Sequence, residues 1–67
     1  MYTTFHSIAD IRKWLMQFNI VVYTKDKRTD LELMEGEIKE AYQSGLLDQY
    51  TYQQALLVLR REKSSLH

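Results

Sequence analysis

Two helix-ending residues, Asn19 and Gly45, divide this chain into three stretches of helical periodicity, and this division constrains the fold most. Both residue types adopt the left-handed backbone conformation that closes many helices. A chain of 67 residues without proline or an internal repeat offers no linker at which to separate domains. We therefore expect residues 1–67 to form one all-α domain, a three-helix bundle with helices at about residues 8–18, 30–44 and 49–63.

Apolar residues recur at helical spacing in each stretch and define the expected core. They are Ile8, Ile11, Leu15 and Phe18 in the first stretch, Leu31, Met34, Ile38, Ala41 and Tyr42 in the second, and Tyr52, Ala55, Leu56 and Leu59 in the third. Trp14 lies about 80° from the centre of the first stripe if each residue turns the helix by about 100°. We expect its ring at the edge of the core, packed against a neighbouring helix.

Capping residues predict where the second and third helices begin. Thr29 and Glu32 have the spacing of a capping box, in which two side chains satisfy amides at the helix start. This pattern places the start of the second helix at Asp30. Asp48 is the predicted N-cap of the third helix.

The segment between the first two helices joins an apolar strip to a basic loop. Residues 20–23 are mostly β-branched, and we expect them to be extended without a partner strand. Cations in the loop that follows would bind phosphates, and the Tyr23 ring would stack on a base, as in single-stranded nucleic-acid sites. The alternative is an ordinary surface loop with Tyr23 at the edge of the core. The candidate nucleic-acid-binding residues are Arg12, Lys13, Tyr23, Lys25, Lys27 and Arg28.

Charge is balanced overall but unevenly distributed. Nine Lys and Arg residues match nine Asp and Glu residues, which argues against strong, sequence-independent attraction to nucleic acid or anionic lipid. Residues 1–28 are mainly basic and residues 29–45 mainly acidic. Such a surface could orient a charged ligand or dock two copies head to tail, although solvated helix faces are the simplest interpretation.

An unbroken apolar run in the third helix suggests a second functional hypothesis. Within Ala55–Leu59, Leu57 and Val58 lie outside the predicted stripe and form an apolar face that a three-helix core would not cover. We expect this face to mediate self-association or, together with the acidic helix at residues 30–44, to hold a protein partner. The chain would then be a homo-oligomeric interaction adaptor with no nucleic-acid role.

Other function classes have little support in the sequence. Readout of duplex DNA by a helix-turn-helix is disfavoured because the first turns of the 49–63 helix lack Lys and Arg. We expect no enzyme activity, no cofactor, no small-molecule substrate and no metal site, since no nucleophile–base pair, glycine-rich phosphate loop or Glu-x-x-His motif is present. Cysteine is absent and no apolar stretch could span a bilayer, so we expect a cytoplasmic protein.

Short signatures follow one another in a distinctive order from Phe5 to Glu62. They are the 8–18 stretch, Ile20-Val-Val-Tyr23, the loop with Asp26 and Arg28, Leu31-Glu-Leu-Met34, Glu37-Ile-Lys-Glu40, Tyr42, Gly45-Leu46, Tyr52, Ala55 and Val58-Leu-Arg60. Their succession at these spacings resembles the YqgQ-like family of small bacterial proteins. The resemblance implies a three-helix bundle in a functionally uncharacterised family, with a suggested role in binding single-stranded nucleic acid.

Overall fold

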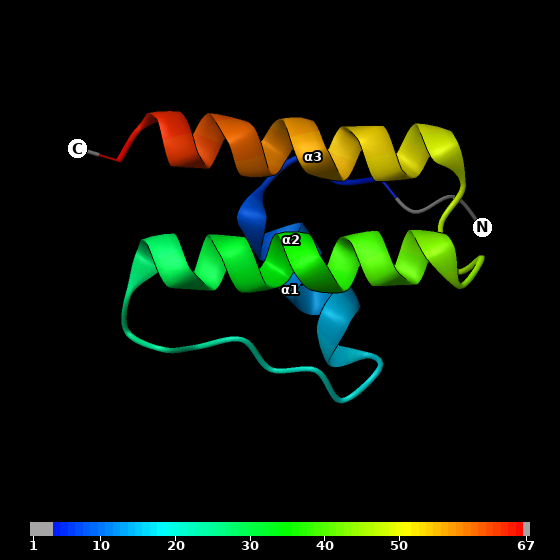
Figure 1. Cartoon of the computed structure of the whole chain (residues 1–67), viewed down its shortest axis with the longest axis horizontal. Coiled ribbons are helices and arrows are strands. Elements are labelled where there is room, and N and C mark those ends of the chain that lie inside the picture. The colour runs from blue at the N-terminus through cyan, green and yellow to red at the C-terminus, as the bar shows by residue number, and fades with distance from the viewer. Residues whose placement is uncertain (1–3, 67) are drawn as a thin grey trace.

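The computed structural model describes residues 4–66 and contains three helices, α1 (Ile8–Met16), α2 (Lys27–Gln43) and α3 (Gln49–Ser64). Helices α2 and α3 run antiparallel and make the most extensive contact, and α1 crosses behind α2 in the view of Figure 1. No strand occurs within residues 4–66. The all-α three-helix bundle is therefore confirmed.

The core forms where the apolar stripes of the three helices meet. Six large side chains are less than 2 % exposed, and all six lie in the predicted stripes: Ile11, Leu15, Leu31, Met34, Ile38 and Leu59. Trp14 is buried at the edge of this cluster, as predicted. Phe18 and Tyr42 were expected in the core but lie at the ends of their stripes and are exposed. Tyr42 instead stacks on Tyr52, with ring centroids 4.2 Å apart.

Helix α1 ends two residues earlier than predicted, but it is closed as predicted. Its last helical residue is Met16, and a turn follows. Asn19 has a φ of 62°, and the Ile20 N–H donates to the Leu15 carbonyl at 3.1 Å. This hydrogen bond, from the sixth residue back to the first as in a Schellman motif, satisfies a carbonyl that the helix end would otherwise leave unpaired.

The predicted capping box at Thr29 is wrong, because Asp26 caps α2 three residues earlier. The Asp26 carboxylate accepts hydrogen bonds from the N–H groups of Arg28 at 3.0 Å and Thr29 at 3.3 Å. Aspartate is a stronger N-cap than threonine, so the earlier site prevails. Lys27 and Arg28 consequently lie in the first turn of α2 and not in a loop.

The turn between α2 and α3 follows the sequence prediction closely. Gly45 has a φ of +81°, and the Leu46 N–H donates to the Ala41 carbonyl at 2.9 Å. Asp48 then caps α3 by accepting from the Thr51 N–H at 3.0 Å. Hydrogen bonds from the hydroxyl and amide of Thr51 lower the pKa of Asp48 below its ordinary value, since they favour the charged carboxylate.

Val58 was predicted to lie on an uncovered face, and this placement is wrong. Its side chain is 3 % exposed and belongs to the core. The buried face of α3 is Thr51, Ala55, Val58 and Leu59, which is rotated from the predicted stripe. Phe5, which precedes α1, is buried in the same core cluster and lines the same hollow as Val58. A core built from three helical stripes alone omits this ring.

Candidate binding surfaces

The connection between α1 and α2 is fixed in place although it has no regular secondary structure. Val22 is buried in the core, and its neighbours Val21 and Tyr23 point outward. Thr24 is held by Asp30, whose Oδ1 accepts from both the Thr24 N–H and the Thr24 hydroxyl at 2.7 Å. Asp30 itself is only 5 % exposed. These contacts present the Tyr23 ring to solvent at a fixed point of the surface.

Four of the six candidate nucleic-acid-binding residues lie within six consecutive residues, at the end of the connection and the start of α2. We call Tyr23, Lys25, Lys27 and Arg28 the basic patch. Tyr23 is 67 % exposed and makes no ring contact with the described part of the chain. Lys25 adopts a left-handed conformation with a φ of 69°. Lys25 and Arg28 are exposed, and neither forms an ion pair within residues 4–66.

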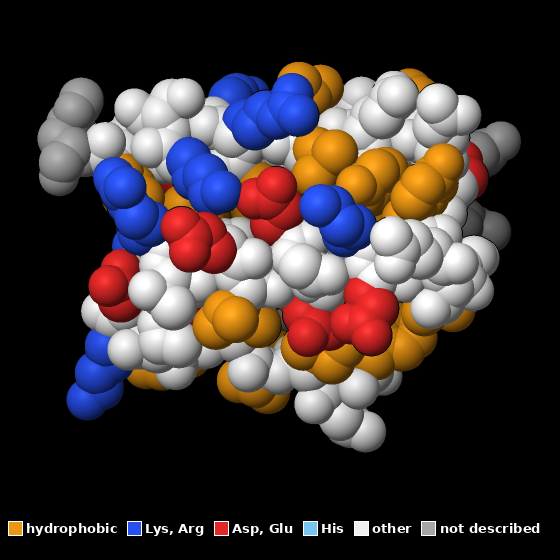
Figure 2. Space-filling model, in the orientation of Figure 1, with side chains coloured by type: hydrophobic (Ala, Val, Ile, Leu, Met, Phe, Trp, Pro, Cys, Tyr) orange, Lys and Arg blue, Asp and Glu red, His pale blue; other side chains and the backbone are white. Residues whose placement is uncertain are grey.

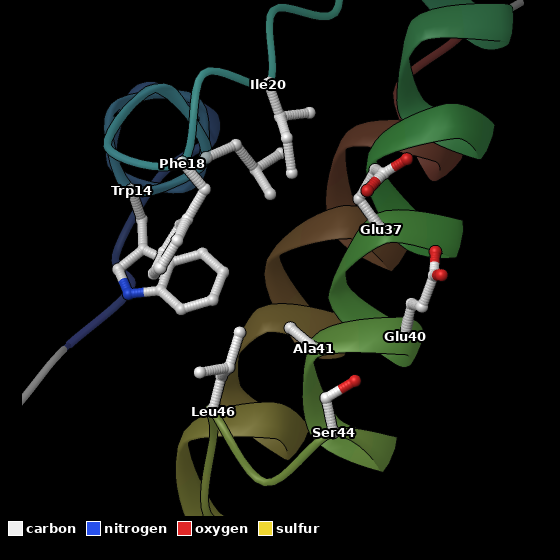
Figure 3. A pocket seen from close by; sticks show the side chains of 9 residues that line it. Trp14, Phe18, Ile20, Glu37, Glu40, Ala41, Ser44 and Leu46 are labelled. Carbon is white, nitrogen blue, oxygen red and sulfur yellow. The ribbon is translucent and has the colours of Figure 1, made fainter.

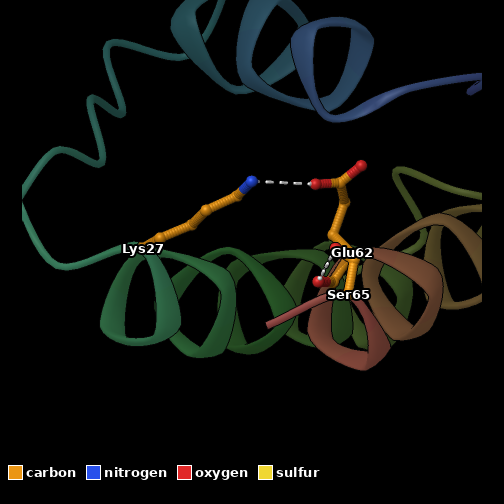
Figure 4. A network of polar contacts seen from close by, with 3 residues as sticks. All are labelled: Lys27, Glu62 and Ser65. Atoms are coloured by element: carbon orange, nitrogen blue, oxygen red, sulfur yellow. Dashed lines mark hydrogen bonds and ion pairs between the residues drawn. The ribbon is translucent and has the colours of Figure 1, made fainter. Parts of the chain in front are cut away.

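Lys27 differs from the other cations because it is already paired. Its Nζ lies 3.3 Å from Glu62 Oε2, and this ion pair joins the start of α2 to the end of α3 (Figure 4). A second ion pair, Lys63–Glu35 at 2.9 Å, ties the same helices together. Figure 2 shows Lys and Arg side chains alternating with acidic ones at the edge where α2 begins and α3 ends. The free positive charge of the patch is therefore carried mainly by Lys25 and Arg28.

Arg12 and Lys13 are not joined to the basic patch. Both belong to α1, and among the described residues no hydrogen bond or ion pair connects them to it. Arg12 is half-buried, and its Nε atom is buried without a hydrogen-bond partner in the described part of the structure. Lys13 is exposed.

A groove lies between the end of α1 and the second half of α2, and we call it the aromatic groove. It encloses about 230 Å³. Trp14 and Phe18 form one side, with ring centroids 4.8 Å apart, and face Ala41 and Leu46 across the groove (Figure 3). Its other lining residues are Leu15, Ile20, Glu37, Glu40 and Ser44. Sequence reasoning missed this site, since it placed Phe18 in the core.

Leu57 stands on the outer side of α3, as predicted, and is 52 % exposed. It lines two shallow hollows. One, of about 380 Å³, also contains the stacked rings of Tyr42 and Tyr52, and the other, of about 350 Å³, contains Phe5. The predicted partner face thus keeps Leu57 and loses Val58.

Outside these surfaces, the carboxylate of Asp10 has a structural role. Asp10 Oδ2 accepts from the backbone N–H of His6 at 3.0 Å, so this carboxylate braces the start of α1. Residues 4–66 contain no group of three or more His, Asp or Glu side chains that could hold a metal ion. Within the same residues, no helix is long and apolar enough to cross a membrane.

Comparison with known proteins identifies the family. The family model described as YqgQ-like matches residues 5–65. The chain is also similar to the uncharacterized protein YqgQ of Bacillus subtilis (strain 168), with 32 % identity over 57 residues that cover 85 % of this chain and 80 % of the relative. No solved structure gives a significant match. The chain belongs to the YqgQ-like family, whose resemblance was apparent in the sequence.

Proposed function

We propose that this member of the YqgQ-like family binds single-stranded nucleic acid weakly through the basic patch. The observation that carries the proposal is the exposed Tyr23 ring, held by the contacts of Val22 and Thr24. Lys25 and Arg28 follow it closely in the chain and form no ion pair within residues 4–66. A solvent-exposed ring on a fixed backbone offers a stacking surface without the ordering cost of a mobile loop. Stacking of a base on such a ring contributes about 1–3 kcal/mol.

The position of the cations favours an anionic ligand. Lys27 and Arg28 lie at the positive end of the α2 dipole, where cations are unfavourable for the helix itself. Asp26 and Asp30 offset part of this charge. A phosphate group would reduce the remaining repulsion, because it brings negative charge to the helix start.

The expected salt dependence follows from the number of free cations. Each phosphate neutralised on a single strand contributes a slope of about −0.7 in a plot of log affinity against log salt. Contacts from Lys25 and Arg28 would give a slope near −1.4, so a fourfold rise in salt should weaken binding about sevenfold. Net neutrality of the chain keeps the affinity modest.

Fluorescence anisotropy with a labelled single-stranded oligonucleotide tests the proposal. Lys25→Glu combined with Arg28→Glu should abolish binding at low salt, and Tyr23→Ala should weaken it without changing the salt slope. The control is Lys39→Glu with Arg60→Glu, which makes the same charge change at exposed positions outside the patch. Equal loss in the control and patch variants would show only a general charge effect and contradict the assignment.

A second candidate function is protein association through α3. The observation that favours it is Leu57, which is half-exposed between two hollows that contain aromatic rings. Sedimentation should show concentration-dependent association that Leu57→Asp removes. A monomer at high protein concentration would count against this candidate.

Both candidates describe binding, and we assign no catalysis and no cofactor to the chain. The cytoplasmic location stays a prediction. A pull-down with and without nuclease treatment separates the two candidates. Nuclease-sensitive recovery of partners supports nucleic-acid binding through the basic patch. Nuclease-resistant recovery of one protein, lost in the Leu57→Asp variant, supports protein association through the outer side of α3 around Leu57, which we call the Leu57 face.

A further inference from the structure

We propose that the aromatic groove binds a segment of another protein that inserts one large apolar side chain and carries lysine or arginine within a helical turn of it. The groove is separate from the basic patch and from the Leu57 face. Its walls come from two elements far apart in the sequence, the end of α1 and the second half of α2. The inference does not depend on nucleic-acid binding.

The groove is apolar inside and open to solvent. Phe18 is exposed although it packs on Trp14, and Leu46 is 56 % exposed after the Gly45 turn. Trp14 also contacts Phe5, with ring centroids 6.0 Å apart in an edge-to-face arrangement. A rigid aromatic wall gives contact area at little entropic cost, as in the anchor pockets of protein interfaces.

The charge of the rim selects the partner. Glu37 and Glu40 lie one helical turn apart on the α2 side (Figure 3). Neither forms an ion pair within residues 4–66, whereas Glu35 on the same helix is paired with Lys63. Two unpaired carboxylates beside an apolar surface attract a cation that flanks an apolar anchor and repel an acidic segment.

The size of the groove argues for a side chain and against a drug-sized molecule. Its volume of about 230 Å³ is below the range of roughly 300–1,000 Å³ in which small-molecule sites occur. One large apolar side chain can fill such a space, and the backbone on either side of it can place cations over the rim. A short amphipathic helix has this geometry, with cations three or four residues from the anchor.

Selection from a library of random 12-residue peptides, displayed on phage and panned on the immobilised chain, tests the proposal. We expect enrichment of peptides that contain Leu, Phe, Trp or Ile with Lys or Arg three or four positions away. Leu46→Arg should remove the enrichment, because it places a cation and extra bulk in the groove. Leu33→Arg is the matched control, since Leu33 is exposed to a similar degree, 47 % against 56 %, and lies outside the groove.

A selected peptide without tryptophan then gives an affinity directly. Trp14 is the chain's single tryptophan and lines the groove, so its emission should change on titration with the peptide. Glu37→Gln with Glu40→Gln should weaken binding about two- to thirtyfold at low salt, as expected for two exposed charge pairs. Glu32→Gln, on the same helix, should leave the affinity unchanged.

Several outcomes overturn the proposal. They are selected peptides that are neutral or acidic, equal enrichment on the Leu46→Arg variant, and no enrichment at all. Self-association that Leu46→Arg abolishes would instead assign the groove to a second copy of the chain. Loss of oligonucleotide binding in the Tyr23 and Lys25 variants leaves this proposal unaffected, so the two ideas fail separately.

Discussion

Replacing Asp30 by alanine should destabilise the fold far more than its position in the first turns of a surface helix suggests. The carboxylate is 5 % exposed and accepts two hydrogen bonds of 2.7 Å from Thr24. Hydrogen bonds to charged groups contribute about 1.5–3 kcal/mol each, and partial exposure of Thr24 favours the lower end of this range. Loss of both bonds should therefore cost about 3 kcal/mol.

This loss is large relative to the stability of so small a domain. At about 0.05–0.15 kcal/mol per residue, the whole chain would be stable by roughly 3–10 kcal/mol. For a domain of this size, 1 kcal/mol shifts the thermal midpoint by about 4–8 °C, so Asp30→Ala should lower Tm by roughly 12–24 °C. Circular dichroism at 222 nm during thermal and urea unfolding measures both quantities.

Thr24→Val separates the two hydrogen bonds. It removes the hydroxyl but keeps the backbone N–H, so it should cost about half as much as Asp30→Ala. The double variant should be as stable as Asp30→Ala alone, to within a few tenths of a kcal/mol, because the Thr24 hydroxyl donates its hydrogen bond to Asp30 and both changes remove that bond. If the free energy of unfolding of Asp30→Ala is within about 1 kcal/mol of that of the parent chain, Asp30 does not anchor the connection between α1 and α2.

Three further predictions test individual elements. Gly36→Ala should stabilise the chain by about 1 kcal/mol, since an added Cβ contacts no neighbouring element of the described residues within 4 Å. Gly45→Ala should destabilise the chain by about the same amount, because the φ of Gly45 is +81°. Urea unfolding measures both changes in stability. Asp48→Ala should destabilise the chain near neutral pH, because it removes the N-cap of α3. Because the folded-state pKa of Asp48 is depressed, this contribution is present above its ordinary value of 3.8 and is lost as pH falls below it, so unfolding of the two proteins should converge in acid. Val58→Asp should abolish the helical signal because it buries an unpaired charge, while Leu57→Asp should change stability by less than about 0.5 kcal/mol.

The helices could be predicted from the sequence where local signals act alone. Asn19 and Gly45 end helices because their backbone conformation is an intrinsic preference, and Asp48 caps α3 without competition. The start of α2 was mispredicted because two local signals, Asp26 and Thr29, compete within three residues. Asp26 prevails because aspartate is the stronger N-cap, whereas the sequence prediction followed the capping-box spacing of Thr29 and Glu32.

The binding surfaces could be predicted only in part, because they depend on tertiary contacts. The basic patch was found from its composition, but the pairing of Lys27 with Glu62 joins residues that are far apart in the sequence. The core that buries Val58 also contains Phe5, which lies outside the three helices. The aromatic groove is lined by Phe18, which follows the end of α1 and is exposed, whereas the sequence pattern placed it inside the helix and in the core.

The basic patch and the aromatic groove lie toward opposite ends of α2, and salt should decide whether they influence each other. Lys27 and Glu37 are ten residues apart on one helix, which separates them by about 15 Å along its axis. This distance exceeds the screening length of about 8 Å at 0.15 M salt but is shorter than the length of about 30 Å at 0.01 M. Glu37→Gln with Glu40→Gln should therefore raise oligonucleotide affinity at 0.01 M salt and leave it unchanged at 0.15 M. An effect of equal size at both salt concentrations would mean that the variant alters the shape of the patch. It would refute the view that the two surfaces are coupled only by electrostatics.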